Sequence, residues 1–259
     1  MTIKDVTNYL EEIAPLQHAE DFDNVGLLIG NYDTKVKGIL VTLDTLEDTV
    51  DEAIASNCNL IVSFHPIIFS GLKKINGNSY VERVVLKAIR NDIAIYATHT
   101  ALDNSKVGVS AKMCEVLSLQ NSKILIPKNE EQIGMGMIGE LSEAMEEEDF
   151  LNYVKMTFNT GCVRYSEKLS KPIKKVAVLG GSGSFAISNA IDEKADAYIS
   201  ADFKYHDFFS AEGKILLADV GHYESEQFTK NLLVEYLTKK FTSFAVILSE
   251  KSTNPIYYL

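Results

Sequence analysis

The sequence predicts an α/β protein whose mostly parallel or mixed sheets are covered by helices. Short, continuous apolar runs alternate with amphipathic helical patterns along the 259-residue chain, which is typical of strands buried on both faces of a parallel sheet. The 46% content of apolar residues is sufficient for a hydrophobic core. A polar stretch at residues 120–132 contains Pro127 and separates two such sets of strands and helices, so we expect a linker there.

Strand and helix signals follow one another closely in the first half of the chain. Residues 3–14 place apolar side chains at helical spacing and stop before Pro15, which predicts an amphipathic opening helix. A turn-rich segment at residues 20–30 leads into a short apolar strand. Further strands are expected at residues 37–44, 60–63 and 93–98, and further helices at residues 46–57, 79–91 and 107–117.

The same alternation of strands and helices returns after the expected linker. Strands are expected at residues 134–140, 175–179, 197–200 and 243–248, and helices at residues 146–158, 185–194 and 225–240. The two halves are alike in this rhythm but not residue by residue, so an internal repeat is not established.

Charge and composition exclude several classes of protein. A net charge of -11 argues against general nucleic-acid binding, because that affinity comes from Lys and Arg side chains that neutralise phosphates. Cys58, Cys114 and Cys162 are odd in number and lack CxxC spacing, so we interpret them as reduced, buried thiols of a cytosolic protein. The sequence shows neither a secretory signal nor an apolar run long enough to span a membrane, and we expect a cytoplasmic location.

Histidines and carboxylates at the ends of expected strands indicate a metal site. His222 and Glu226 are four residues apart, so in a helix they project from one face and could hold one cation. His65 follows one strand, while His99 and Asp103 follow the next. Because ligand sites in open α/β sheets form beyond the carboxyl ends of the strands, these residues could converge with the helical pair. Imidazole and carboxylate ligands suit zinc, iron or manganese.

Each of these histidines taken alone is more simply explained as a hydrogen-bonded structural residue. The argument for a metal rests on their concentration, because three of only five histidines follow apolar strands with a carboxylate or proline nearby. A metal site of this kind favours hydrolysis of a small molecule. His99 is either a general acid/base or a hydrogen-bonding neighbour of the ligands.

Six separated segments resemble one known family. In chain order, the matching segments are Phe22-Asp-Asn-Val-Gly-Leu27, Ser63-Phe-His-Pro-Ile-Ile-Phe69, His99-Thr-Ala-Leu-Asp103, Gly180-Gly-Ser-Gly183, Asp202-Phe-Lys-Tyr-His206 and Gly221-His-Tyr-Glu-Ser-Glu226. The chain resembles the Nif-three-like family, also known as GTP cyclohydrolase 1 type 2 homologues, in a short form without an inserted middle domain. The resemblance implies a dinuclear metal site, two α/β domains and a ring-shaped homohexamer.

The resemblance also implies a role for each matching residue. His65 and Asp103 would bind one metal ion, His222 would bind the other, and Glu226 would bridge both. Phe64 departs from the family's usual His-His-Pro pattern and cannot coordinate a metal, so the second ion is weak, absent, or completed by water or His99. We expect one or two divalent ions per chain.

The two domains implied by the resemblance can be placed on the sequence. We expect a first domain of residues 1–125 and 221–259, which carries most of the ligands, and a second domain of residues 126–220.

Three further features have competing interpretations. The Gly180–Gly183 segment partly fits a phosphate-binding turn, but a tight turn explains it as well. Asp202, Lys204 and His206 would share one side of an extended strand, as an anion-binding wall or as a salt bridge with a capping histidine. Asp23 and Asn24 could brace the site or form an Asx turn.

These observations favour a metal-dependent hydrolase acting on a nucleotide or another phosphorylated small molecule, with Glu226 and His99 as catalytic residues. The alternatives are a metal-stabilised oligomeric scaffold or regulatory protein without turnover, and a nucleotide sensor that uses the glycine turn.

Overall fold

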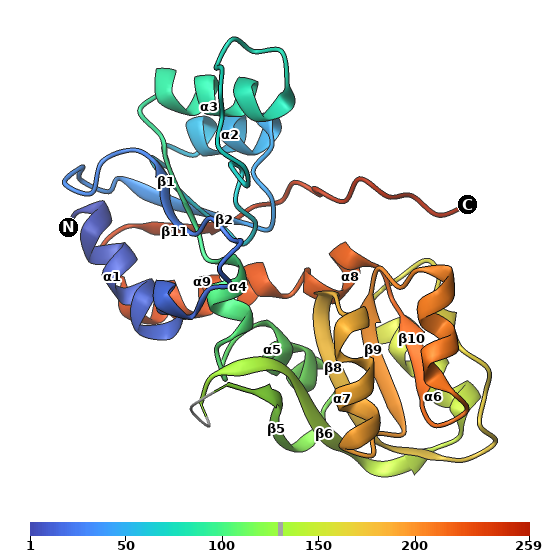
Figure 1. Cartoon of the computed structure of the whole chain (residues 1–259). Coiled ribbons are helices and arrows are strands. Elements are labelled where there is room, and N and C mark those ends of the chain that lie inside the picture. Colours follow the sequence, from blue (N-terminus) through green and yellow to red (C-terminus); the bar gives the residue numbers. More distant parts are fainter. Residues whose placement is uncertain (129–131) are drawn as a thin grey trace. The chain divides into compact units, whose positions relative to one another are not determined.

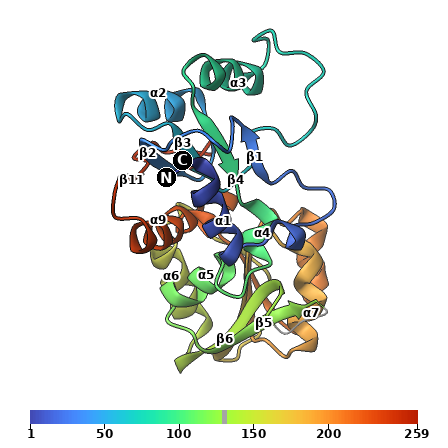
Figure 2. The same ribbon diagram turned by 90° about the vertical axis from the view of Figure 1, so that its left-hand side faces the viewer.

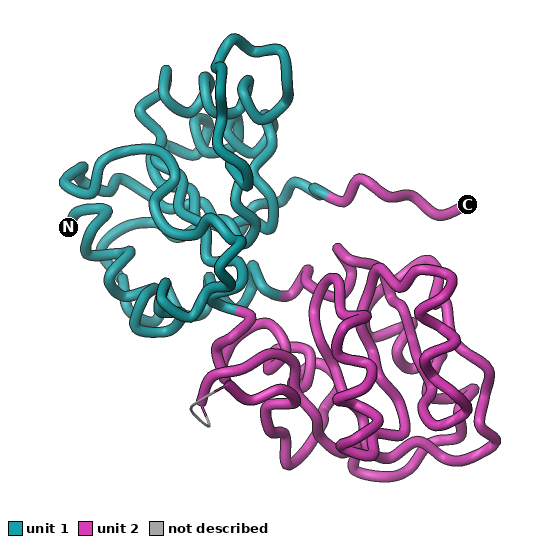
Figure 3. Tube along the Cα trace, viewed as in Figure 1, with its two compact units in different colours: residues 1–102, 229–253 teal, residues 103–228, 254–259 magenta. Residues whose placement is uncertain are grey.

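The computed structural model describes residues 1–128 and 132–259, which form two compact units. Unit 1 comprises Met1–Leu102 and Thr229–Thr253, and unit 2 comprises Asp103–Phe228 and Asn254–Leu259 (Figure 3). These bounds differ from those of the expected domains, because residues 103–125, 221–228 and 254–259 belong to unit 2.

Unit 1 is built on a five-stranded sheet in the order β1-β4-β3-β2-β11. Figure 1 labels β1, β2 and β11 of this sheet, and Figure 2 labels all five strands. All neighbouring strands are parallel except β1, which runs antiparallel to β4. The strands are β1 (Gly26–Ile29), β2 (Gly38–Thr42), β3 (Leu60–Ser63), β4 (Ala94–Ala97) and β11 (Ala245–Leu248). Every residue of β2, β3 and β4 is buried, which explains why these strands appear in the sequence as unbroken apolar runs.

Helices cover both faces of the unit 1 sheet. Helices α2 and α3 lie on one face and helices α1 and α9 on the other (Figure 2). The helical elements are α1 (Ile3–Ile13), η1 (Leu16–His18), α2 (Glu47–Ala55), α3 (Tyr80–Arg90), α4 (His99–Asp103) and α9 (Thr229–Lys240). Helix α3 begins where the Ser79 side chain accepts a hydrogen bond from the backbone N–H of Glu82, which satisfies one donor of the first turn.

Unit 2 contains a six-stranded mixed sheet in the order β5-β6-β8-β9-β10-β7. The central strands β8, β9 and β10 are parallel, and the outer strands pair antiparallel. The strands are β5 (Gln120–Pro127), β6 (Gly134–Met145), β7 (Arg164–Tyr165), β8 (Ile173–Ser182), β9 (Ala197–Ala201) and β10 (Leu216–Asp219). The helical elements are α5 (Val109–Val116), α6 (Glu147–Thr157), η2 (Ser184–Ala186), α7 (Ile187–Asp192), η3 (Tyr205–Ala211) and α8 (His222–Glu226).

Each face of the unit 2 sheet packs against its own core. Val176 and Val178 of β8 join one buried cluster with residues of α5 and α6, while Ala177 and Leu179 join another with residues of α7 and η3. The alternation follows from the strand geometry, in which successive side chains point to opposite faces.

The structure corrects three expectations about local elements. Residues 120–127 of the expected linker form strand β5, and residues 129–131 of that linker lie outside the described residues. The expected helix at residues 225–240 is divided into α8 and α9. His206 lies in the 3-10 helix η3, so Asp202, Lys204 and His206 do not share an extended strand.

Cys58 and Cys114 are buried free thiols as expected, but Cys162 is exposed, so the expectation of three buried cysteines is wrong at that position. No helix within the described part of the chain combines the length and the apolar character that crossing a bilayer requires.

Candidate metal centre

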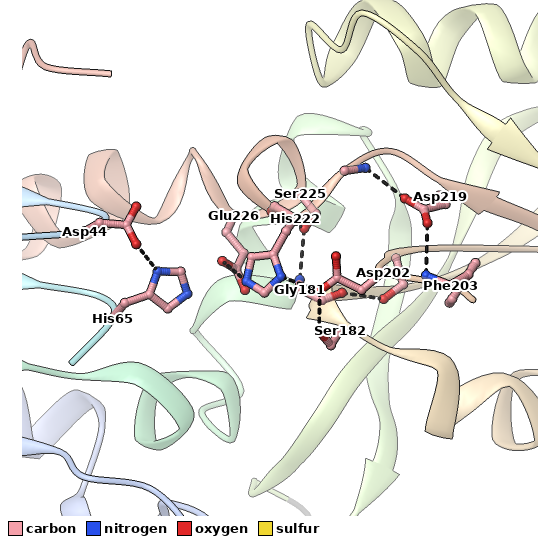
Figure 4. Close-up of polar contacts among 12 residues, drawn as sticks. Asp44, His65, Gly181, Ser182, Asp202, Phe203, Asp219, His222, Ser225 and Glu226 are labelled. Atoms are coloured by element: carbon pink, nitrogen blue, oxygen red, sulfur yellow. Dashed lines mark hydrogen bonds and ion pairs between the residues drawn. The ribbon is translucent and has the colours of Figure 1, made fainter. Parts of the chain in front are cut away.

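The carboxyl ends of β2, β3 and β4 meet at one edge of the unit 1 sheet. The pairing of Thr42 with Ser63, and of Ser63 with Ala97, aligns these ends, so the residues that follow each strand are neighbours. One of them is His65, whose Nδ1 lies 2.8 Å from Oδ1 of Asp44 (Figure 4). Asp44 follows the neighbouring strand β2 and is itself held by Thr253, whose hydroxyl donates to Oδ2 at 2.6 Å.

His99 is held in the same way at the end of β4. Its Nδ1 lies 2.8 Å from Oδ1 of Asp23, and the backbone N–H and hydroxyl of Thr100 donate to the other carboxylate oxygen. Burial raises the pKa of Asp23, but the hydrogen bonds with His99 and Thr100 outweigh burial and lower this pKa to about 2. Asp23 is therefore an anionic brace for His99. Asp103 ends α4, four residues after His99.

Phe64 packs against both imidazoles of unit 1. It is fully buried, and its ring centroid lies 4.9 Å from that of His65 and 5.5 Å from that of His99. The two imidazole centroids are 5.3 Å apart. The family resemblance implies a histidine at position 64. The phenylalanine found there has no atom that could bind a metal ion.

In unit 2, helix α8 brings His222 and Glu226 together, as their spacing predicts. Gly221, with a φ of +94°, turns the chain from β10 into this helix. His222 lies between two carboxylates (Figure 4): its Nδ1 is 2.7 Å from Oδ2 of Asp202, and its Nε2 is 3.2 Å from Oε2 of Glu226. This pair of ligand types could hold a metal ion.

Hydrogen bonds between His222 and its carboxylate neighbours favour the charged form of both His222 and Asp202. Burial lowers the pKa of His222, but its hydrogen bonds with Asp202 and Glu226 outweigh burial and raise this pKa to about 11. The hydrogen bond with His222 lowers the pKa of Asp202 to about 2, and the Ser182 hydroxyl also donates to Asp202. A cation bound by His222 and Glu226 would take the place of the proton at Nε2.

The glycine segment forms the wall behind Glu226. Gly181 has a φ of +68°, and a methyl group added there would overlap Oε1 of Glu226 and lie 3.3 Å from Cε1 of His222. The backbone N–H of Gly181 donates to the Ser225 hydroxyl at 2.9 Å. This donor is therefore already used within the protein, so it would not serve the phosphate-binding interpretation of the segment.

The neighbouring Glu224 has a structural role. It is buried and accepts a hydrogen bond from Nδ2 of Asn254 at 3.0 Å. Lys204 occupies the N-cap position of η3, where its backbone N–H donates to the Asp207 carboxylate.

Sequence reasoning did not find Asp44 or Asp202 as partners of histidines. Each lies near the carboxyl end of a buried strand, which is also where His65 and His99 lie. This strand-end position could have identified both aspartates from the sequence. Each candidate histidine thus has a carboxylate at Nδ1.

The fold and these residues define a class of α/β protein whose histidine–carboxylate pairs could hold a metal ion. The family model described as Duf34/NIF3 (NGG1p interacting factor 3) matches residues 1–255. The chain belongs to this family, which confirms the resemblance seen in its motifs.

Relatives and solved structures agree with this assignment. A Clostridium acetobutylicum protein named GTP cyclohydrolase 1 type 2 homolog is 34% identical over 229 residues, which cover 87% of this chain and 85% of that protein. A Bacillus cereus protein related to NIF3 superposes with a TM-score of 0.92 at 25% identity, over 100% of this chain and 99% of that one. Staphylococcus aureus protein SA1388 superposes with a TM-score of 0.91 at 29% identity, with the same coverage. The expected α/β fold is confirmed.

Proposed function

We propose that this chain is a metal-dependent hydrolase acting on a nucleotide or another phosphorylated small molecule. The residues that would hold one or two divalent ions are the ligands that the family resemblance implies, namely His65, Asp103, His222 and Glu226. The cytoplasmic location and the homohexamer expected from the sequence belong to the same proposal.

The observation that carries the proposal is the anchoring of the imidazoles by carboxylates. Asp44 holds Nδ1 of His65, and Asp202 holds Nδ1 of His222. When Nδ1 donates its proton to a carboxylate, Nε2 carries the lone pair and points in a set direction, as metal-binding histidines require. Both units show this arrangement independently.

The residues have distinct roles in the proposed reaction. A bound divalent ion supplies a Lewis acid and lowers the pKa of a water molecule toward neutrality. Glu226, whose carboxylate is buried in unit 2, would accept a proton from the attacking water. His99, held by anionic Asp23, would donate a proton to the leaving group.

The substrate class rests on the names of the relatives. Several are named GTP cyclohydrolase 1 type 2 homolog, and this name indicates a nucleotide. No residue described above selects guanine over other bases, so the proposal stops at nucleotides and related phosphorylated compounds.

Phe64 favours a second candidate function, a metal-stabilised scaffold without turnover. A fully buried phenylalanine beside His65 removes a potential ligand, which would leave one tightly held ion and no second ion to assist hydrolysis.

Metal analysis and one pair of variants test these alternatives. The purified chain is analysed for metal, reconstituted with zinc, iron or manganese, and assayed against a panel of nucleotides. Glu226→Gln removes a ligand charge while keeping the side-chain shape. Glu224→Gln is the matched control, because it makes the same change on the same helix at a residue that contacts Asn254.

We expect Glu226→Gln to lose both metal and hydrolysis while Glu224→Gln keeps them. Stoichiometric metal without turnover on any nucleotide would favour the scaffold. A wild-type chain that binds none of these metals would exclude both functions.

A further inference from the structure

Two exposed phenylalanines contact each other in unit 1. Phe22 is 67% exposed and Phe69 is 51% exposed, and their ring centroids lie 6.3 Å apart at an interplanar angle of 49°. A single exposed aromatic side chain is ordinary in a folded protein. Two that come from distant segments, contact each other and are each more than half exposed form a surface that suits a flat apolar ligand.

This pair of rings lies beside His99 of the same unit. Phe69 meets His99 edge to face, with centroids 6.2 Å apart and planes at 76°. Phe22 directly precedes Asp23, the residue that holds His99. The side chain of Asn24 donates to the backbone oxygen of Ile68, which ties the two segments together.

We propose that Phe22 and Phe69 form a stacking platform for the planar heteroaromatic ring of a nucleotide substrate. One ring can stack on the face of the ligand while the other, inclined at 49°, meets its edge. A ring stacked there lies next to His99. The proposal specifies which residues bind the base, and it rests on the proposed function for the reaction that follows binding.

Size and charge favour a small anionic ligand over a protein partner. A stable protein interface needs about 20 to 30 residues a side, whereas this platform consists of two side chains. The loop that carries Phe69 continues with Lys73 and Lys74, both exposed. In a chain of net charge -11, these two lysines provide local positive charge for a phosphate group.

The absence of tryptophan from the sequence makes stacking directly measurable. Phe69→Trp introduces a unique fluorophore into a chain with no native tryptophan, and a stacked base quenches its emission. Tyr80→Trp is the matched control, because Tyr80 is also exposed in unit 1 but begins helix α3. Circular dichroism checks that both variants fold. Titrations use guanosine, adenosine and uridine monophosphates, with ribose 5-phosphate as a ligand without a base.

We expect saturable quenching of the Phe69→Trp protein by the nucleotides, and none by ribose 5-phosphate or in the Tyr80→Trp control. Adding Phe22→Ala to Phe69→Trp should weaken binding by about 5- to 150-fold, the range expected for loss of one stacking ring. An unchanged affinity after Phe22→Ala would overturn the platform, as would equal quenching at both tryptophans or no saturation.

Repeating the titration in metal-stripped protein and in the Glu226→Gln background separates this inference from the proposed hydrolase. Base stacking needs no metal, so quenching should persist in both. Persistent quenching together with no hydrolysis by the metal-reconstituted wild-type protein would refute the hydrolase and leave the platform standing. Sedimentation gives a further check: if Phe22→Ala and Phe69→Ala dissociate an assembly and nucleotides cause no quenching, a second copy of the chain covers these rings and the inference is wrong.

Discussion

Gly181→Ala tests how closely the glycine segment supports the His222–Glu226 pair. Gly181 has a φ of +68°, where an alanine costs roughly 1–2 kcal/mol. The added methyl group would also overlap Oε1 of Glu226 and lie 3.3 Å from Cε1 of His222. Displacing Glu226 weakens a hydrogen bond between charged groups, which contributes about 1.5–3 kcal/mol. The combined loss of folding free energy should be about 2.5–5 kcal/mol.

Gly213→Ala provides the control for backbone strain. Gly213 lies in the same unit with a φ of +64°, and an added methyl group there would meet no atom within 4 Å. This variant should lose only about 1–2 kcal/mol. Because the two positions share the same strain, the difference between the variants isolates the contact with Glu226.

Urea unfolding and metal titration measure the two consequences. We expect Gly181→Ala to be the less stable variant and to bind zinc or manganese about 10- to 100-fold more weakly than Gly213→Ala, because the displaced ligand is no longer oriented. Equal stability and equal metal affinity in the two alanine variants would refute the view that this segment positions Glu226.

Three further predictions concern the residues around the histidines. Asp202→Asn should weaken metal binding about 10- to 100-fold in a titration while keeping the backbone, because asparagine tolerates the φ of +58° at this position. The pKa of Asp23 is lowered from 3.8 to about 2, so its ionised carboxylate stabilises the fold above pH 3.8, and this contribution is lost as the pH falls toward 2. After solvent screening we expect the contribution to be about 1–2 kcal/mol. It should appear as a pH-dependent midpoint of urea unfolding, and Asp23→Asn should flatten that dependence. Phe64→His should raise the metal content by up to one ion per chain in elemental analysis, at a cost in melting temperature because Phe64 is fully buried; an unchanged metal content would contradict the idea that this residue removes a ligand.

The elements that the sequence predicted well are those whose own residues carry the signal. Strands β2, β3 and β4 are buried along their whole length, so each is a continuous apolar run. The sequence of strand β5 predicts a linker because its first four residues are exposed. The segment is a strand because its backbone pairs with β6. An edge strand of this kind has little local signal, since its partner lies elsewhere in the chain.

The break between α8 and α9 has a similar cause. Residues 225–240 predict one helix, but the side chain of Gln227 donates to the backbone oxygens of Phe158 and Glu224. Phe158 follows helix α6, so this contact depends on a distant segment that helical periodicity does not reveal.

The candidate site also combines features that depend on local sequence with features that depend on distant contacts. The sequence by itself determined that His222 and Glu226 are neighbours and that His65 and His99 follow buried strands, because both facts depend on local spacing. Only the tertiary structure decided that Asp44, Asp23 and Asp202 hold the imidazoles. Their positions at turns and strand ends mark these three as candidates among 36 acidic residues, but no local pattern pairs each with its histidine, since the partners are 20 to 76 residues apart and meet only when each sheet forms.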